Sequence, residues 1–186
     1  MQNRSTITLE ALLARLGEQK HPPVAQWQPD HCGEIDIRIL RDGRWLHDGA
    51  EINRPELVRL FAGILRREEG GFYLVTPAEK LRIQVEDAPF LVVSMQQLLD
   101  DKQRPLIVLT TNVGDELLVD DQHALWVEQD PVSGEPSPYV HVREGLNALL
   151  SRSVFYELVD AGEICGKELL ISSAGCSFSL GAVAQD

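Results

Sequence analysis

The chain has 186 residues, 44% of them hydrophobic and 25% charged, with a formal net charge of −12 at pH 7. This composition excludes a disordered or fibrous chain, and the length allows one large domain or two small ones. The negative charge argues against a nucleic-acid-binding protein, because binding phosphates requires a basic surface.

The N-terminal part predicts a helix followed by a linker. The apolar side chains of Leu9, Leu12, Leu13 and Leu16 recur at helical spacing, Thr8 is a good N-cap type, and Gly17 supplies a stop. The proline-rich stretch 21–30 then reads as an extended linker, because proline lacks a backbone donor and restricts the residue before it.

A small meander follows the linker. Ile35, Ile37 and Ile39 alternate with polar residues, which predicts a half-buried strand over 34–40. The pairs Asp42-Gly43 and Asp48-Gly49 are typical of tight turns. We therefore expect a second strand over 44–47 and a short return that leads to Ile52.

The next segment predicts an amphipathic helix. Asn53 offers a side-chain oxygen as the N-cap, and Glu56 is placed to complete a capping box. One face is continuously apolar, formed by Leu57, Leu60, Phe61, Ile64 and Leu65. We expect this helix to end at Gly70-Gly71 and to be followed by strands over 72–75, 81–85 and 90–95.

The second part of the chain begins after a polar stretch over 96–105. It predicts strands over 106–110, 117–119 and 124–128, a hairpin tip over 130–138 and a strand over 139–142. A second Leu-rich helix then runs from Arg143 through Val159, and Ala161-Gly162 ends it. Two final strands are expected over 168–172 and 176–180.

The two predicted Leu-rich helices share a pattern at a spacing of 89 residues. Arg54, Leu57 and Leu60 in the first correspond to Arg143, Leu146 and Leu149 in the second. A chance match of two ordinary helices is the alternative. We predict an α+β protein of two related halves, each a small, mostly antiparallel sheet packed with one amphipathic helix, plus an N-terminal helix. The expected division is 1–25 for the N-terminal helix and linker, 26–97 for the first half and 98–186 for the second.

Targeting and redox signals favour the cytoplasm. Apolar runs are too short to cross a bilayer, and the N-terminus has an amphipathic pattern and not that of a signal peptide. Cys32, Cys165 and Cys176 are scattered and odd in number, which fits neither a disulfide framework nor a structural zinc site. We expect a cytoplasmic protein with no membrane contact and no cofactor, with self-association left open.

Basic side chains are concentrated in the first half. Residues 1–94 carry 12 basic and 14 acidic side chains, whereas residues 95–186 carry 5 and 15. Arg54 and Arg143, at the expected helix starts, and His141 could present positive charge and amide donors to an anion. The alternative is that these are surface residues bonding the chain's own turns.

A run of carboxylates offers a weaker candidate for chemistry. Asp115, Asp120 and His123, with Glu116 and Asp121 beside them, could hold a hard cation. The run lacks the strict alternation and the glycine of a calcium loop, and no spacing supports a specific acid and base pair. A metal site at Asp115, Asp120 and His123 is therefore only the weaker alternative.

Several linked motifs resemble the bacterial family called domain of unknown function 1285. They include Asp42-Gly43-x-Trp45, Ile52-x-Arg54-x-x-Leu57, Tyr73-Leu74-Val75-Thr76-Pro77-x-Glu79-Lys80, Thr111-Asn112-Val113-Gly114-Asp115-Glu116 and Pro138-Tyr139-Val140-His141-Val142-Arg143. The resemblance covers roughly residues 33–181. It implies a two-part α+β fold with repeated motifs, no established activity, and a suggested role in ligand binding or signal transduction. It also makes Thr76, Glu79, Lys80, Thr111 and Asn112 candidate site residues, although each fits a structural turn as well.

We therefore expect a non-enzymatic ligand-binding or regulatory module. Its groove between the halves would bind a small anionic ligand or an acidic segment of a protein partner, through Arg54, Lys80, Asn112, His141 and Arg143. One alternative is a metal-dependent hydrolase that uses Glu79, Asp115 and His123. The other is a protein-interaction scaffold with an exposed apolar patch.

Overall fold

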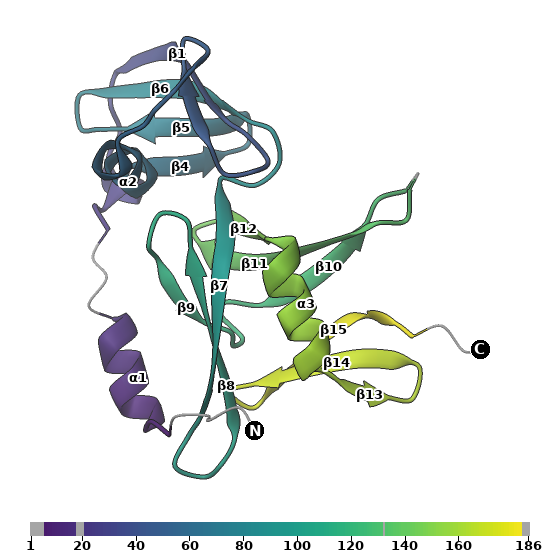
Figure 1. Ribbon diagram of the computed structural model, residues 1–186. Coiled ribbons are helices and arrows are strands. Elements are labelled where there is room, and N and C mark those ends of the chain that lie inside the picture. Colours follow the sequence, from purple (N-terminus) through teal and green to yellow (C-terminus); the bar gives the residue numbers. More distant parts are fainter. Residues whose placement is uncertain (1–5, 18–20, 132, 184–186) are drawn as a thin grey trace.

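The computed structural model describes residues 6–17, 21–131 and 133–183, and places them in two halves (Figure 1). Helix α1 (Leu9–Leu16) and the short 3-10 turn η1 (Val24–Gln26) precede the first sheet. The other helices of the described residues are α2 (Pro55–Gly63) in the first half and α3 (Arg152–Ala161) in the second. None of these helices is long and apolar enough to span a membrane.

Each half contains a six-stranded sheet. The first sheet is formed by β1 (His31–Ile39), β2 (Trp45–His47), β3 (Ala50–Glu51), β4 (Leu65–Glu68), β5 (Gly71–Val75) and β6 (Glu79–Val85). The second sheet is formed by β7 (Phe90–Leu99), β8 (Pro105–Thr111), β9 (Glu116–Leu118), β10 (Leu125–Gln129), β11 (Pro136–Arg143) and β12 (Leu146–Leu150). A third, smaller sheet contains β13 (Glu163–Cys165), β14 (Glu168–Ser173) and β15 (Cys176–Ala182).

The two large sheets follow the same strand path. Their orders are β3-β2-β1-β6-β5-β4 and β9-β8-β7-β12-β11-β10. In each, only the central pair is parallel, β1 with β6 and β7 with β12, and the outer strands pair antiparallel. The expected α+β fold of two related, mostly antiparallel halves is therefore confirmed. The sheets divide between β6 and β7, so the expected boundary at residues 97 and 98 falls inside β7.

The corresponding turns of the two sheets are more alike than the helices are. The β1–β2 turn is closed by hydrogen bonds from the Leu40 amide to the Arg44 carbonyl (2.9 Å) and from the Gly43 amide to the Leu40 carbonyl (3.0 Å). The β7–β8 turn repeats both bonds 60 residues later, between Asp100, Arg104 and Gln103. The repeat of the fold thus has a spacing near 60 residues at this point.

The helix expected to start at Arg143 is wrong in its first part, and with it the 89-residue match. Arg143 ends β11, and Leu146 and Leu149 belong to β12, whereas Arg54 precedes α2. The reason is the turn between them: Glu144 and Gly145 both have positive φ, 44° and 76°, which closes a tight hairpin. Helix α3 begins only after Ser151, whose Oγ accepts a hydrogen bond from the Val154 amide.

Helix α2 also differs from its expected form. Its N-cap is Arg54 without a side-chain hydrogen bond, and Asn53 instead donates to the Glu51 carbonyl (3.4 Å). Pro55 occupies the first helical position, where its missing amide hydrogen has no cost. The helix ends at Gly63, because residues 65–68 pair with β5 and form β4. The capping box at Asn53 and the helical end at Gly70-Gly71 are therefore wrong.

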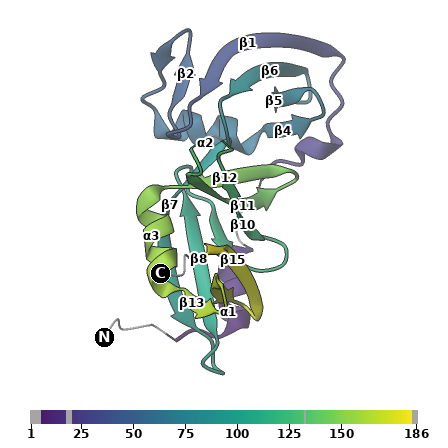
Figure 2. The same cartoon turned by 90° about the vertical axis from the view of Figure 1, so that its right-hand side faces the viewer.

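One hydrophobic core connects the two halves. The same cluster contains Trp45 and Leu65 from the first sheet and Phe90, Leu109 and Leu146 from the second. In two perpendicular views, α2 lies at the base of the first half, next to the second (Figures 1 and 2). A smaller cluster seats α1 on the second sheet. The halves are therefore packed against each other, which creates a junction with defined walls.

Candidate functional site

The candidate residues of the first half lie in two different surroundings. The Thr76 hydroxyl accepts hydrogen bonds from the amides of Ala78 (3.3 Å) and Glu79 (3.1 Å) and so holds the β5–β6 turn. Lys80 donates to Glu68 (2.8 Å), and this bond raises the pKa of Lys80 and lowers the pKa of Glu68. Arg54 lies elsewhere, at the start of α2, where it lines a pocket of the first half.

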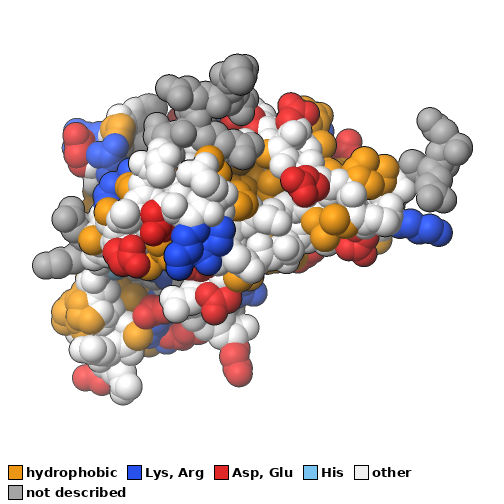
Figure 3. All heavy atoms as spheres, turned by 90° about the horizontal axis from the view of Figure 1, so that it is seen from below, with side chains coloured by type: hydrophobic (Ala, Val, Ile, Leu, Met, Phe, Trp, Pro, Cys, Tyr) orange, Lys and Arg blue, Asp and Glu red, His pale blue; other side chains and the backbone are white. Residues whose placement is uncertain are grey.

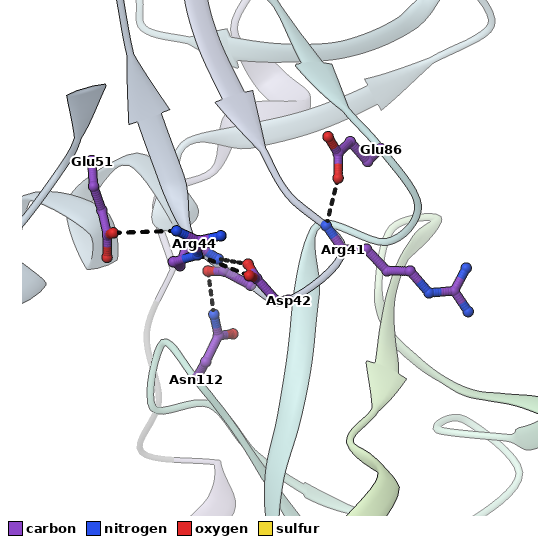
Figure 4. A network of polar contacts seen from close by, with 7 residues as sticks. Arg41, Asp42, Arg44, Glu51, Glu86 and Asn112 are labelled. Carbon is purple, nitrogen blue, oxygen red and sulfur yellow. Dashed lines mark hydrogen bonds and ion pairs between the residues drawn. The ribbon is translucent and has the colours of Figure 1, made fainter. Parts of the chain in front are cut away.

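Thr111 closes the β8–β9 turn, and Asn112 connects this turn to the first half. The buried Thr111 hydroxyl accepts a hydrogen bond from the Asp115 amide (3.0 Å). The Asn112 side chain donates to the carbonyl oxygen of Gly43 (3.0 Å) and accepts from the Leu91 amide (3.1 Å). Asn112 thus connects the β1–β2 turn of the first half to the second sheet, as the close-up shows (Figure 4).

Arg143 is a second polar link across the junction. Its guanidinium donates to the Asp115 carboxylate (2.6 Å) and to the Ala62 carbonyl at the end of α2 (2.9 Å). It also lies over the Phe90 ring, 5.0 Å from the centroid. The imidazole of His141 contacts Asn147 on the neighbouring strand (3.2 Å). The structure therefore brings Asn112 and Arg143 to the junction, but Arg54 and Arg143 line different pockets.

The carboxylate candidates lie beside α1. A pocket of about 440 Å³ is lined by Asp115, Asp120 and His123, together with His21 and Arg143. Burial, and then the positive charge of Arg143, lower the pKa of His21, against the opposing effects of Asp115 and Glu144. The described residues contain no group of three or more His, Cys, Asp and Glu side chains placed to hold a metal ion.

The second half carries an excess of acidic side chains, so an anion site there requires a locally positive surface. Figure 3 shows acidic side chains spread over the face beneath this half, and residues 95–186 carry 15 acidic and 5 basic side chains. Binding of an anion therefore depends on positions where guanidinium groups and backbone amides gather. The junction contains one such position.

We call it the junction cleft, a hollow of about 520 Å³ between the β1–β2 turn, the β10–β11 hairpin and the start of α3. Its lining includes Arg41, Leu91, Ser137, Ser151, Arg152 and Phe155, together with the acidic residues Asp42, Asp130 and Glu135. Arg41 and Asp42 come from the first half and the others come from the second. The cleft is therefore complete only when both halves are in place.

Arg41 spans the junction beside this cleft. Its guanidinium donates to the Ser137 hydroxyl (2.8 Å) and pairs with Asp87 (3.0 Å), while 57% of its side chain stays exposed. Figure 4 shows the side chain extending away from the cluster of Asp42, Arg44 and Glu51. In that cluster Asp42 is paired with Arg44 (2.8 Å), and hydrogen bonding to the backbone amide of Arg44 lowers the pKa of Asp42. The negative charge of Asp42, which follows Arg41 in the chain, is thus already balanced by the positive charge of Arg44.

The start of α3 supplies the second positive element of the cleft. Arg152 is 83% exposed and lies 3.8 Å from Glu135, a loose ion pair that costs little to replace. The first amides of a helix carry the positive end of its dipole and favour an anion. In the sequence, Arg41 stands out only as one of the basic residues of the first half, and sequence reasoning missed Arg152. Ser151 is a typical N-cap residue, but the longer helix expected from Arg143 places it inside the helix and not at its start.

Two matching six-stranded sheets, joined by a common core and a cleft lined from both sides, define a two-part α+β protein with a ligand-sized junction. The chain belongs to the DUF1285 family: the N-terminal domain of this domain of unknown function matches residues 22–88, and the C-terminal domain matches residues 89–180. The two matches meet where the sheets divide. The expected family membership is confirmed.

Two crystal structures of family members resemble this chain. A DUF1285 family protein from Silicibacter pomeroyi DSS-3 is 46% identical, with a TM-score of 0.81, over 92% of this chain and 95% of that protein. A DUF1285 family protein from Shewanella baltica OS155 is 28% identical, with a TM-score of 0.51, over 67% of this chain and 90% of that protein. The comparison with curated proteins gave no match.

Proposed function

We propose that this protein is a non-enzymatic regulatory module that binds a small anionic ligand in the junction cleft. The observation that carries the proposal is Arg41, which belongs to the first half, bonds Ser137 of the second and keeps over half of its side chain exposed. A ligand that takes a hydrogen bond from Arg41 would change a contact between the halves. Binding would therefore be coupled to the way the halves pack, which is what a sensor requires.

The alternatives have less support. Asp115 and His123 line the pocket beside α1, whereas Glu79 belongs to β6 in the first half, so a hydrolase using all three has no common site. For a scaffold, the exposed large hydrophobic side chains among the described residues are Leu13, Leu60, Val93, Tyr156 and Ile164. They belong to five different elements, and this gives no reason to prefer one apolar patch.

The compartment is part of the proposal. The thiols of Cys32 and Cys165 are free and exposed, and such thiols persist in a reducing compartment. They support a cytoplasmic module that would meet small anionic metabolites directly.

The test is a thermal-shift screen against nucleotides, phosphorylated metabolites and carboxylates, with divalent cations and a chelator as separate arms. A ligand that binds only the folded protein raises its melting temperature by mass action. We expect one anionic class to raise it, and calorimetry on that class to show about a tenfold or greater loss of affinity in Arg41→Gln and in Arg152→Gln.

Arg59→Gln is the matched control, because it removes one exposed guanidinium outside the cleft. Its affinity for the same ligand should equal that of the wild type. Equal losses in Arg59→Gln and Arg152→Gln would reduce the effect to general charge and contradict the proposal. A screen in which only a metal ion raises the melting temperature would favour the enzyme instead.

A further inference from the structure

The first half contains a pocket of its own, apart from the junction cleft. It has a volume of about 430 Å³ and lies between β1, β3 and α2. Its walls are mainly apolar, formed by Ile35, Ile37, Ile52, Leu57 and Phe61. Ligand sites typically measure about 300 to 1,000 Å³ and combine apolar walls with a few polar groups. This pocket, the α2 pocket, has that size and that lining.

Arg54 lines this pocket, together with the polar residues His47, Glu51 and Asn53. The side chain of Arg54 has no hydrogen-bond or ion-pair partner among the residues that the structure describes. The nearby carboxylate of Glu51 is paired with Arg44, at 3.6 Å. Arg54 is therefore the unpaired charge at this pocket. The start of α2 adds to the positive potential, because this helix has no side-chain N-cap.

We propose that the α2 pocket binds a small amphiphilic carboxylate. The apolar body would lie among the isoleucine side chains and Phe61, and the carboxylate would accept a bidentate hydrogen bond from Arg54. A compact, highly charged phosphate does not fit, because the apolar walls offer no replacement for its hydration. A neutral apolar molecule would leave Arg54 without a partner. The site shares no wall residue with the junction cleft, so it does not depend on the function proposed there.

A buried tryptophan next to the pocket reports on its occupancy. Trp45 is 2% exposed, and its ring stacks on that of Phe61 with 6.3 Å between the centroids. Within the described part of the chain, the indole Nε1 of Trp45 has no hydrogen-bond partner. Its NMR signal is therefore sensitive to the packing of the Phe61 ring, and a ligand that moves Phe61 should shift it. Trp27 and Trp126 lie outside the pocket lining and serve as internal references.

The experiment is a titration of the full chain with octanoate, followed by the three indole signals in a nitrogen-correlated proton spectrum and assigned with Trp45→Phe. The neutral probe is 1-octanol. We expect octanoate to shift the Trp45 signal and leave those of Trp27 and Trp126 in place. Arg54→Gln should weaken octanoate binding by about tenfold or more, since a charge-assisted hydrogen bond is lost, and should leave 1-octanol unaffected.

Arg59→Gln, on the same helix and with the same change in charge, should bind octanoate like the wild type. Equal octanoate affinity in Arg54→Gln and Arg59→Gln would overturn the proposal, as would a Trp45 signal that stays fixed at saturating octanoate. A Trp45 signal that depends on protein concentration without octanoate would mean that a second copy covers the pocket, and would also overturn it.

A second variant keeps the test independent of Arg54. Ala50 lines the pocket from the exposed strand β3, so Ala50→Phe should fill the mouth without disturbing the core. We expect it to abolish octanoate binding while the protein melts cooperatively. Unchanged octanoate binding in a folded Ala50→Phe variant would place the ligand elsewhere.

Discussion

Arg143 of the second half donates a hydrogen bond to the carbonyl oxygen of Ala62, near the end of α2 in the first half, at 2.9 Å. The same guanidinium pairs with Asp115, whose side chain is only 11% exposed. One side chain thus satisfies a helix-end carbonyl of one half and a carboxylate of the other. This arrangement makes Arg143 a structural link between the two halves.

Replacing Arg143 should destabilise the whole protein. Arg143→Gln removes the ion pair between the guanidinium and Asp115 and the hydrogen bond to Ala62. We expect a loss of about 2 to 3 kcal/mol in the free energy of unfolding, measured by urea denaturation. Arg152→Gln, which breaks an exposed pair, should cost less than about 0.5 kcal/mol. Equal losses in the two variants would contradict the structural role of Arg143.

Gly43 should be required by its surroundings as well as by its conformation. Its φ is +86°, and an added Cβ would lie 2.8 Å from the side-chain nitrogen Nδ2 of Asn112 and 3.1 Å from the Cβ of Leu91. Gly49 has a similar φ of +77°, but nothing lies within 4 Å of an added Cβ. Gly49→Ala should therefore show only backbone strain, about 1 kcal/mol.

Gly43→Ala should add the displacement of Asn112 to that strain. We expect a loss at least about 1 kcal/mol larger than that of Gly49→Ala, because the hydrogen bond across the junction is disturbed. Thermal or urea unfolding of both variants gives the comparison. If the two alanine variants were equally stable, the close approach at Gly43 would have no energetic weight.

The strands that could be predicted from sequence are those that have one buried face. Ile37 and Ile39 are buried while Asp36 and Arg38 are exposed, and this alternation is visible in the sequence. Strand β12 has no such signal, because four of its five residues are buried and only Asn147 is not. A short apolar run of this kind is compatible with a helix or a strand. The turn residues Glu144 and Gly145 were the better guide to β12.

The candidate site was harder to predict, because its contacts join distant parts of the chain. Arg143 and Ala62 are 81 residues apart, and Arg41 and Ser137 are 96 apart. No local pattern encodes which arginine reaches which carbonyl or hydroxyl. Asn112 became a candidate through the family resemblance, and Arg143 through a helix start that the structure does not have. Their contacts between the halves depend on how the sheets pack.

His21 should make stability depend on pH below neutrality. Burial and the charge of Arg143 lower its pKa from 6.5, so the folded protein favours the neutral imidazole. The unfolded chain binds the proton at about pH 6.5 and the folded chain only at a lower pH. The contribution of neutral His21 to the free energy of unfolding is therefore complete above pH 6.5 and is lost as the pH falls through its folded-state pKa.

We expect the urea midpoint to fall between about pH 7.5 and 5.5, and to fall less in His21→Asn. His31→Asn, at an exposed position, serves as the control and should follow the wild type. The carboxyl groups of Asp42 and Glu68 have pKa values lowered from 3.8 and 4.5, so they change the stability of the protein only at more acidic pH. An identical pH profile in His21→Asn and the wild type would contradict this prediction.

Tyr139 should titrate at a higher pH than an ordinary tyrosine. Burial, and then the hydrogen bond that its hydroxyl donates to Asp87 (2.8 Å), raise the pKa of Tyr139 from 10.0 to about 12. The folded state favours the neutral phenol, so this contribution to stability is complete below pH 10 and is lost as the pH rises towards 12.

The near-ultraviolet absorbance of phenolate, recorded after a pH jump and before unfolding, should show one late step. Tyr139→Phe should remove that step and, at neutral pH, cost about 1 kcal/mol through the lost hydrogen bond. A late step that persists in Tyr139→Phe would assign it to another tyrosine, and the bond to Asp87 would then not govern the titration.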